Sequence, residues 1–258
     1  MIAVVDYQKG NLKSVERGLI AAGGEAFITA NASEIAKADA IVLPGVGAFA
    51  DAAATMCELG QMEVIRERVR AGVPFLGICL GEHLMFEHGV EGAPEGNPAC
   101  GLGLLPGTVV AMPRCDAQGK TFKVPHVGWN TIEMPACNGG AAVPSCGGVG
   151  GQVEPELSSL RSENAGGAFP GSTPQPGSEL AFACPLFDGI APGEYFYFTH
   201  SYIAPTGSHT IAETTHSTRF TSAVQFGECA FGVQFHPEKS SDAGARVLAN
   251  FVAIAARG

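Results

Sequence analysis

The chain has 258 residues, a formal net charge of −10 and 46% hydrophobic residues, a composition typical of a globular protein large enough to bury a core. The acidic balance leaves no basic face for a phosphate backbone, so we do not expect nucleic-acid binding as the main activity. The eight cysteines form no Cys-x-x-Cys pair, so we expect them to be reduced thiols. Met1–Asp6 is expected to be a first strand rather than a leader or membrane span, which favours a cytoplasmic location.

Strands and helices are expected to alternate through the first 80 residues. Short apolar runs predict buried strands at Ile2–Val5, Ala26–Thr29, Ala40–Leu43 and Phe75–Ile78. Helical patterns occupy Asn11–Ala22, a short segment capped by Ser33, Ala50–Leu59 and Gln61–Ala71. This alternation predicts an α/β fold with a doubly wound, mostly parallel central sheet flanked by helices. The carboxyl ends of its strands are expected to carry the chemistry.

The second half of the chain changes texture. Strand-like segments are expected at Leu104–Met112, Thr121–Val124, Tyr195–Ile203, Thr210–Thr215, Ser222–Phe226 and Phe231–Phe235. We predict that they form additional antiparallel strands, either in the first sheet or beside it, and that Asp242–Ala256 closes the chain as a helix. A segment at about 135–178 is rich in Gly, Ser and Pro and is expected to be a disordered insertion in one domain spanning residues 1–258.

The stretch Pro74–Phe86 has the pattern of a nucleophile elbow. An apolar strand ends at Cys79, glycines stand two residues before and two after it, and a helical pattern resumes with Leu80, Leu84 and Met85. Small flanking residues allow a strained turn that projects the thiol, and the N–H groups of a following helix favour the nucleophilic thiolate. A buried structural cysteine fits this stretch equally well.

A second motif supplies the groups that an elbow cysteine needs. In Phe235-His236-Pro237-Glu238, the imidazole and the carboxylate stand two residues apart and can face one region if the segment is extended. Cysteine, histidine and acid together form a nucleophilic triad. Taken singly, His236 can be a structural histidine and Glu238 a solvated acid.

A metal site is the competing use of these side chains. Cys79, His83, His236 and Glu238 are all possible ligands, but no Cys-x-x-Cys or His-x-x-x-His spacing supports coordination. We therefore expect no metal and no flavin or nucleotide cofactor.

Several motifs in order resemble a known family. Gly77-Ile78-Cys79-Leu80-Gly81 with His236-Pro237-Glu238 is similar to the signature of the triad-type, class I glutamine amidotransferases. Within that family the chain resembles the glutaminase subunits of imidazole glycerol phosphate synthase. That closer resemblance rests on the opening Asp6-Tyr7 to Gly10-Asn11-Leu12, and on Pro44–Phe49, Lys123–Asn130, His200-Ser201-Tyr202 and Gly232–Ser240. It covers nearly the whole chain apart from the insertion and implies the class I glutamine amidotransferase fold.

The resemblance implies a mechanism. Cys79 is expected to attack the carboxamide of L-glutamine, His236 to protonate the departing ammonia and later activate water, and Glu238 to orient the imidazole. The backbone N–H groups of Leu80 and Val46, the latter after a peptide flip, are expected to form the oxyanion hole.

The resemblance also implies the residues that meet the substrate and the partner. The substrate-binding residues are expected to be Gly45, Gly47, His83, His200, Ser201 and Tyr202. The partner is a (β/α)8-barrel cyclase, separate or fused, which receives ammonia through a sheltered tunnel in histidine biosynthesis and stimulates the glutaminase. Asn11, Trp129 and Asn130 are expected at this interface, although Trp129 can equally be a core aromatic.

Two positions depart from the family pattern. Glutamine commonly stands four residues after the cysteine, whereas this chain has His83, preceded by Glu82. His83 can supply the substrate contact or leave the site weaker. Gln8, where glycine is common, lies in a loop. A triad hydrolase acting on another amide, or an inactive regulatory homologue that binds the cyclase, therefore remain as alternative functions.

Overall fold

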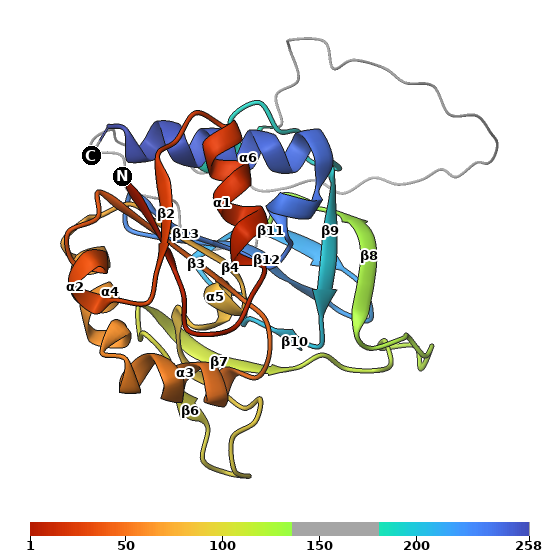
Figure 1. The fold of residues 1–258 in the computed structure, drawn as a ribbon. Coiled ribbons are helices and arrows are strands. Elements are labelled where there is room, and N and C mark those ends of the chain that lie inside the picture. Colours follow the sequence, from red (N-terminus) through yellow and green to blue (C-terminus); the bar gives the residue numbers. More distant parts are fainter. Residues whose placement is uncertain (136–180, 258) are drawn as a thin grey trace, which may run out of the picture. The chain divides into compact units, whose positions relative to one another are not determined.

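The computed structural model of the chain describes residues 1–135 and 181–257. The predicted insertion at about 135–178 lies almost entirely outside these ranges. Within them the chain folds around a seven-stranded sheet in the order β11-β12-β13-β4-β3-β1-β2 (Figure 1). Its strands are β1 (Ile2–Val5), β2 (Ala26–Thr29), β3 (Ala40–Gly45), β4 (Phe75–Cys79), β11 (Thr210–Thr215), β12 (Arg219–Phe226) and β13 (Ala230–Val233).

The sheet is mostly parallel, as the sequence predicts. β2, β1, β3, β4 and β13 run in one direction. β12 pairs antiparallel with β13, and β11 pairs antiparallel with β12, so this end of the sheet is an antiparallel extension. Every residue of β1, β3 and β4 is buried, because helices cover both faces and each side chain packs against one of them. The pairing of Gly45 with Cys79, and of Val233 with Ile78, brings the carboxyl ends of β3, β4 and β13 to one place.

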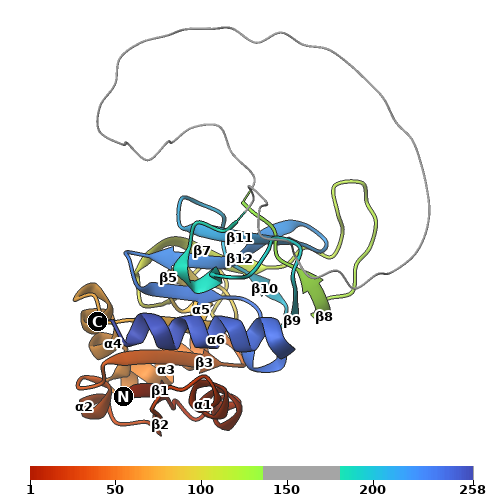
Figure 2. The same cartoon turned by 90° about the horizontal axis from the view of Figure 1, so that it is seen from above.

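Two groups of helices enclose the sheet in separate apolar layers (Figures 1 and 2). One face carries α1 and α6 and contains Ile2, Val4, Leu19, Leu248 and Phe251; the other carries α2, α3 and α4 and contains Val5, Leu43, Phe49, Met56 and Ile65. The helices are α1 (Leu12–Ala21), α2 (Ala32–Ile35), α3 (Phe49–Glu58), α4 (Gln61–Arg70), α5 (Leu80–His83) and α6 (Ser241–Ala255), with short 3₁₀ helices η1 (Pro185–Phe187) and η2 (Pro237–Lys239). No helix in the described part is long and apolar enough to cross a membrane.

Two smaller sheets stand beside the main one. A four-stranded sheet has the order β10-β7-β5-β6, and β8 pairs with β9 as an antiparallel ribbon. Their strands are β5 (Phe86–Gly89), β6 (Ala99–Cys100), β7 (Leu105–Ala111), β8 (His126–Thr131), β9 (Tyr195–His200) and β10 (Tyr202–Ile203). The ribbon and β10 place Thr199 to Tyr202 next to the end of β4.

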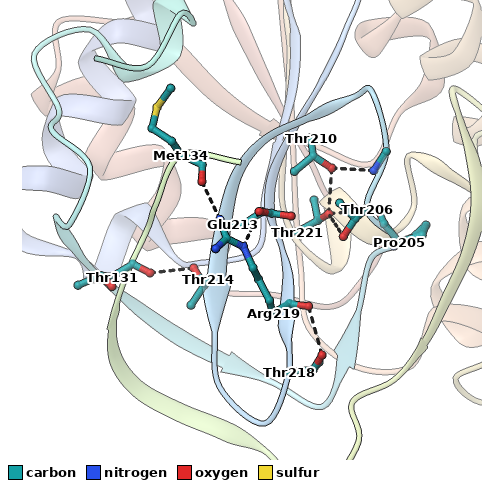
Figure 3. A network of polar contacts seen from close by, with 11 residues as sticks. Thr131, Met134, Pro205, Thr206, Thr210, Glu213, Thr214, Thr218, Arg219 and Thr221 are labelled. Atoms are coloured by element: carbon teal, nitrogen blue, oxygen red, sulfur yellow. Dashed lines mark hydrogen bonds and ion pairs between the residues drawn. The ribbon is translucent and has the colours of Figure 1, made fainter. Parts of the chain in front are cut away.

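A polar network ties the β11–β12 hairpin to the chain that follows β8 (Figure 3). Arg219 donates from Nε to Oε2 of Glu213 (2.6 Å) and from Nη2 to the carbonyl oxygen of Met134 (2.8 Å). Thr214 donates its hydroxyl to the carbonyl of Thr131 (2.9 Å). These bonds hold the end of the first described range against the main sheet.

Several predicted elements differ from the structure. Thr121–Val124 forms no strand and contributes only a bridge between Thr121 and Cys115, whereas β5, β6 and β8 were not predicted. Asn31 caps α2 in place of Ser33, because its side-chain oxygen accepts the N–H of Ser33 (2.9 Å). The strand predicted over Tyr195–Ile203 is broken at Ser201, and the strand predicted over Phe231–Phe235 ends at Val233.

Candidate active site

Cys79 occupies a sharp turn between β4 and α5. Its φ of 54° and ψ of −105° lie outside the regions that L-residues prefer, a strain typical of functional turns. A Cβ on Gly77 would lie 2.5 Å from the carbonyl oxygen of Gly81, and a Cβ on Gly81 would lie 1.8 Å from that of Leu43. Both glycines are therefore required for the strand and helix to approach so closely, as the elbow pattern predicts.

The helix after the elbow is shorter than predicted. α5 is a single turn, Leu84 is its C-cap, and β5 begins at Phe86 after Met85. The turn still presents the free N–H groups of a helix start, including that of Leu80, beside the sulfur. A single turn carries only a small dipole, so the support for a thiolate comes from individual donors more than from the helix as a whole.

His236 and Glu238 form a buried pair where the chain leaves β13. Nδ1 of His236 lies 2.9 Å from Oε1 of Glu238, and the side chains are 4% and 2% exposed. The link between them is not extended throughout, as the sequence interpretation assumed, because Pro237–Lys239 is a 3₁₀ turn. The turn still places both groups together, and the backbone N–H of His236 donates to the carbonyl of Tyr197 in β9 (2.9 Å).

The electrostatics of His236 favour its protonated form. Burial lowers its pKa, but hydrogen bonding and charge interactions with Cys79 and Glu238 outweigh burial and raise the pKa to about 9. Because Nδ1 is bonded to Glu238, Nε2 is the nitrogen available to Cys79. Nε2 is buried, and its contact with the sulfur does not meet the geometric criteria of a hydrogen bond. Such a loose contact is common in free enzymes and tightens when substrate binds.

A cleft of about 280 Å³ opens over Cys79. Five of the six predicted substrate-binding residues line it, together with Val46 and Leu80. The five are Gly47, His83, His200, Ser201 and Tyr202. This volume suits a ligand of amino-acid size.

Gly45 lies beneath the cleft rather than in its wall. It pairs with Cys79 across β3 and β4, and a Cβ there would lie 1.7 Å from the hydroxyl oxygen of Tyr7. The following Val46 is 43% exposed, and Gly47 has a φ of +106°. A peptide between two glycines can rotate at low steric cost, so this loop can present the N–H of Val46 to the cleft.

Glu91 also lines the cleft, although no sequence motif points to it. Burial raises the pKa of its carboxyl, with a smaller contribution from Asp51 and an opposing hydrogen bond from the backbone of Phe49. Its carboxylate is suited to receive a substrate ammonium group. Glu91 follows β5 in a stretch without periodicity, so only the folded structure reveals its position.

His83 and Gln234 form a second buried pair next to Cys79. Nε2 of His83 lies 2.7 Å from Oε1 of Gln234, and Nε2 of Gln234 lies 3.7 Å from the sulfur. Burial lowers the pKa of His83 to about 4, although the bond to Gln234 opposes the shift, so the ring is neutral at neutral pH. One nitrogen of His83 is thus occupied by the protein, and only Nδ1 is left for a contact in the cleft.

Glu82 faces inward from α5 and is fully buried. Neither carboxyl oxygen has a hydrogen-bond partner, and a Cβ on Gly232 would lie 2.7 Å from its Cγ. Burial, and to a lesser extent Cys79, raises the pKa of Glu82 well above its usual range. The buried carboxyl therefore keeps its proton to a higher pH than an exposed glutamate does.

Comparison with known proteins identifies the family. The family described as glutamine amidotransferase class-I matches residues 3–255. The chain belongs to this family. It is 38% identical to the imidazole glycerol phosphate synthase subunit HisH of Moorella thermoacetica, over 97% of this chain and 93% of that protein. It is 36% identical to the subunit of the same name from Aromatoleum aromaticum, over 98% of both.

A solved structure shows the same fold at lower sequence similarity. The crystal structure of a glutamine amidotransferase aligns with a TM-score of 0.60 at 17% identity and covers 99% of this chain and 98% of that one. The predicted α/β class and its antiparallel extension are thus confirmed as the class I amidotransferase fold. In the described residues of this amidotransferase, no three His, Cys, Asp or Glu side chains gather so as to hold a metal ion.

The predicted partner residues of the amidotransferase differ in their surroundings. Trp129 is 51% exposed on β8 and packs against Tyr197 with ring centroids 6.1 Å apart, so it is not a core aromatic. Asn11 is exposed at the start of α1. The amide of Asn130 instead donates to the carbonyl of Thr215 in β11 (3.0 Å), which ties the ribbon to the main sheet.

Proposed function

We propose that this amidotransferase is the glutaminase subunit of an imidazole glycerol phosphate synthase, which hydrolyses L-glutamine and passes ammonia to a cyclase in histidine biosynthesis. The observation that carries the proposal is that Cys79, which lines the cleft, interacts with the buried pair His236–Glu238 beside it. The curated relatives of this name, matched over nearly their full length, support the choice of synthase.

The first half of the reaction makes a thioester. The Cys79 thiolate attacks the side-chain carbonyl carbon of glutamine, and a C–S bond forms as the carbonyl becomes an oxyanion. The N–H groups of Leu80 and, after a peptide rotation, Val46 stabilise that oxyanion, each by about 3 kcal/mol. As the C–N bond breaks, His236 gives the proton of its imidazolium to the departing nitrogen, and ammonia leaves.

The second half regenerates the enzyme. The neutral His236 accepts a proton from water, whose oxygen attacks the thioester carbon; glutamate then leaves and the thiolate returns. Glu238 holds Nδ1–H throughout, so that Nε2 always faces the reacting atoms. Glu91 receives the substrate ammonium group, and the remaining cleft residues contact its carboxylate and carboxamide: Gly47, His83, His200, Ser201 and Tyr202.

The proposed partner is a (β/α)8-barrel cyclase that forms a heterodimer, or a fused protein, with this chain. The exposed Trp129, which packs against the half-buried Tyr197 on the β8–β9 ribbon, gives the cyclase an aromatic docking surface, and the exposed Asn11 is proposed as a further contact. Ammonia passes through a sheltered channel to the acceptor, and the acceptor-bound cyclase rotates the Val46 peptide into its active position. All six cysteines in the described ranges are free thiols, which supports a reducing location such as the cytoplasm.

The test is glutamate release from glutamine in the presence of a cognate cyclase and its acceptor nucleotide. We expect stimulated turnover that falls by about 10³-fold or more in Cys79→Ala, with the exposed Cys57→Ala as the matched control. Turnover of other amides without stimulation would indicate a triad amidase. Cyclase binding with no turnover would indicate an inactive regulatory homologue.

A further inference from the structure

We propose that Gln234 is a positioning residue that donates a hydrogen bond to the Cys79 sulfur, and that His83 fixes the orientation of its amide. This inference rests on the proposed function, since it concerns the nucleophile of that reaction. Gln234 lies one residue beyond β13, where the pairing of Val233 with Ile78 brings it level with Cys79. Its side chain is fully buried and spans the gap between the sulfur and His83.

The chemistry of the two contacts fixes the direction of the bonds. A carbonyl oxygen can only accept, so Nε2 of His83, 2.7 Å from Oε1 of Gln234, must carry the hydrogen. With Oε1 held in this way, the NH₂ group of Gln234 faces the sulfur at 3.7 Å. A donor aimed at sulfur stabilises the thiolate more than the thiol.

The other neighbours of the sulfur show why such a donor matters. The carbonyl oxygen of Thr199, 3.9 Å away, accepts from an S–H group and therefore favours the thiol. Tyr7 and Glu82 also face Cys79, from the loop after β1 and from α5. Burial, and then the charge of Cys79, raises the pKa of each, which favours their neutral forms. His236 is the cation that faces the sulfur. Gln234 adds a neutral donor that favours the thiolate, whereas the carbonyl of Thr199 favours the thiol.

His83 is suited to hold Gln234 because it stays neutral. A neutral imidazole with hydrogen on Nε2 donates one bond to Gln234 without adding a cation beside the elbow. The histidine that replaces the common glutamine of the family thus acts through Gln234 on the nucleophile, in addition to lining the cleft.

The experiment measures alkylation of Cys79 by iodoacetamide as a function of pH, followed by mass spectrometry of the Cys79 peptide in the full-length protein. Gln234→Met removes the donor at similar volume, and we expect the pH of half-maximal reactivity to rise by about 0.5–1 unit, a three- to tenfold loss of rate below the midpoint. Gln234→Glu, which nearly preserves shape, should raise it further. Gln61→Met is the control, because Gln61 is an equally buried glutamine that donates only to the backbone carbonyls of Asp6 and Ala30.

The role of His83 is tested in the same assay. His83→Phe should raise the midpoint less than Gln234→Met, and the double variant should match Gln234→Met alone because both act through one bond. His83→Gln retains a donor and should restore the midpoint of the unmodified chain.

Two results would overturn the inference. If the pH of half-maximal alkylation falls in Gln234→Met, the amide of Gln234 accepts a hydrogen bond from the thiol. If it matches that of the Gln61→Met control, Gln234 has no part in the charge state of Cys79. His236→Asn separates this failure from that of the proposed function: if it also leaves the profile unchanged, the Cys79–His236 pair itself is wrong.

Discussion

At the scale of single residues, His236 sets the pH range of the proposed reaction. Its pKa of about 9 lies above the usual 6.5, so the imidazolium needed to protonate ammonia is present at neutral pH and is lost as the pH rises through about 9. Glutamate release is therefore expected to decline on the alkaline side of that value. In Glu238→Gln the acid that raises the pKa is gone, so the decline should move to lower pH by about one unit or more, and the maximal rate should fall about 10²-fold or more.

The measurement is the pH profile of cyclase-stimulated glutamate release in the two proteins. Glu67→Gln, at an exposed acid on α4, is the matched control and should retain the original profile. An unchanged alkaline limb in Glu238→Gln would show that Glu238 does not act on the charge of His236.

Glu82 is the residue whose burial is least expected. The pKa of Glu82 in the folded protein is raised above the unfolded value of about 4.3. As the pH rises, Glu82 therefore loses its proton at a lower pH in the unfolded chain than in the folded one. Folding stability is lost as the pH rises from about 4.3 toward the folded pKa. Glu82→Met should raise the free energy of unfolding by about 1–3 kcal/mol at pH 8, and by less at pH 5. Urea unfolding at the two pH values measures this, with Glu82→Gln as a control that removes the pH dependence but keeps an unpaired polar group. Equal pH dependence in all three proteins would contradict the assignment.

At the scale of elements, the β8–β9 ribbon carries two buried histidines, His126 and His200, whose neutral forms are favoured by burial. His126 Nδ1 lies 3.0 Å from His200 Nε2, and the His126 ring stacks on His216 at 4.3 Å. Burial is the main reason that the pKa of His126 is lowered to about 4, and the nearby His216 lowers it further. Burial is also the main reason that the pKa of His200 is lowered, with a smaller contribution from neighbouring histidines. In the unfolded chain these groups take up protons below about pH 6.5, so folding stability should fall between about pH 6.5 and 4.

His126→Asn tests this element. We expect the loss of stability between pH 7 and 5 to shrink by about 1 kcal/mol relative to the unmodified chain, while His88→Asn on β5 leaves it unchanged. Chemical denaturation at the two pH values gives the comparison. A slope that persists in His126→Asn would show that the cluster is not the source of acid lability.

The success of sequence interpretation also varied by element. β1 was predicted with its observed bounds, because a strand buried on both faces appears as a continuous apolar run. β2 was also predicted with its observed bounds, although three of its four residues are only half-buried at the sheet edge. β8 was missed because it is half-exposed: Val127 and Trp129 face outward, and only His126 is buried. Cys79, His236 and Glu238 could be proposed from the sequence because each lies in a local motif. Gln234 and Glu91 could not, because their roles come from contacts between segments far apart in the chain.

At the scale of the whole molecule, the described residues on the two sides of the predicted insertion at about 135–178 contribute to the same core. Ile132 and Phe182, which flank that segment, are both buried in the layer that carries α1 and α6, and Arg219 holds the carbonyl of Met134. We propose that the segment is an insertion in a single domain. Replacing it with a short Gly-Ser linker should leave cooperative urea unfolding intact and glutamate release within about twofold, since loop length alone changes closure entropy little.

A longer deletion provides the control. Removing residues 132–178 takes away Ile132 and the acceptor of Arg219, and should lower the unfolding free energy by several kcal/mol, about the cost of losing a buried apolar side chain and a charged hydrogen bond. Aggregation or non-cooperative unfolding of the shorter deletion would contradict the single-domain proposal.

The most direct test of the account follows the amide nitrogen of glutamine. The protein, a cognate cyclase and the acceptor nucleotide are supplied with glutamine labelled with ¹⁵N at the amide, in the presence of excess unlabelled ammonium. The account predicts that the imidazole product carries the label, and that Cys79→Ala abolishes labelled product while unlabelled ammonium still supports turnover by the cyclase. Product without label from the unmodified protein would contradict delivery of ammonia from the Cys79 site.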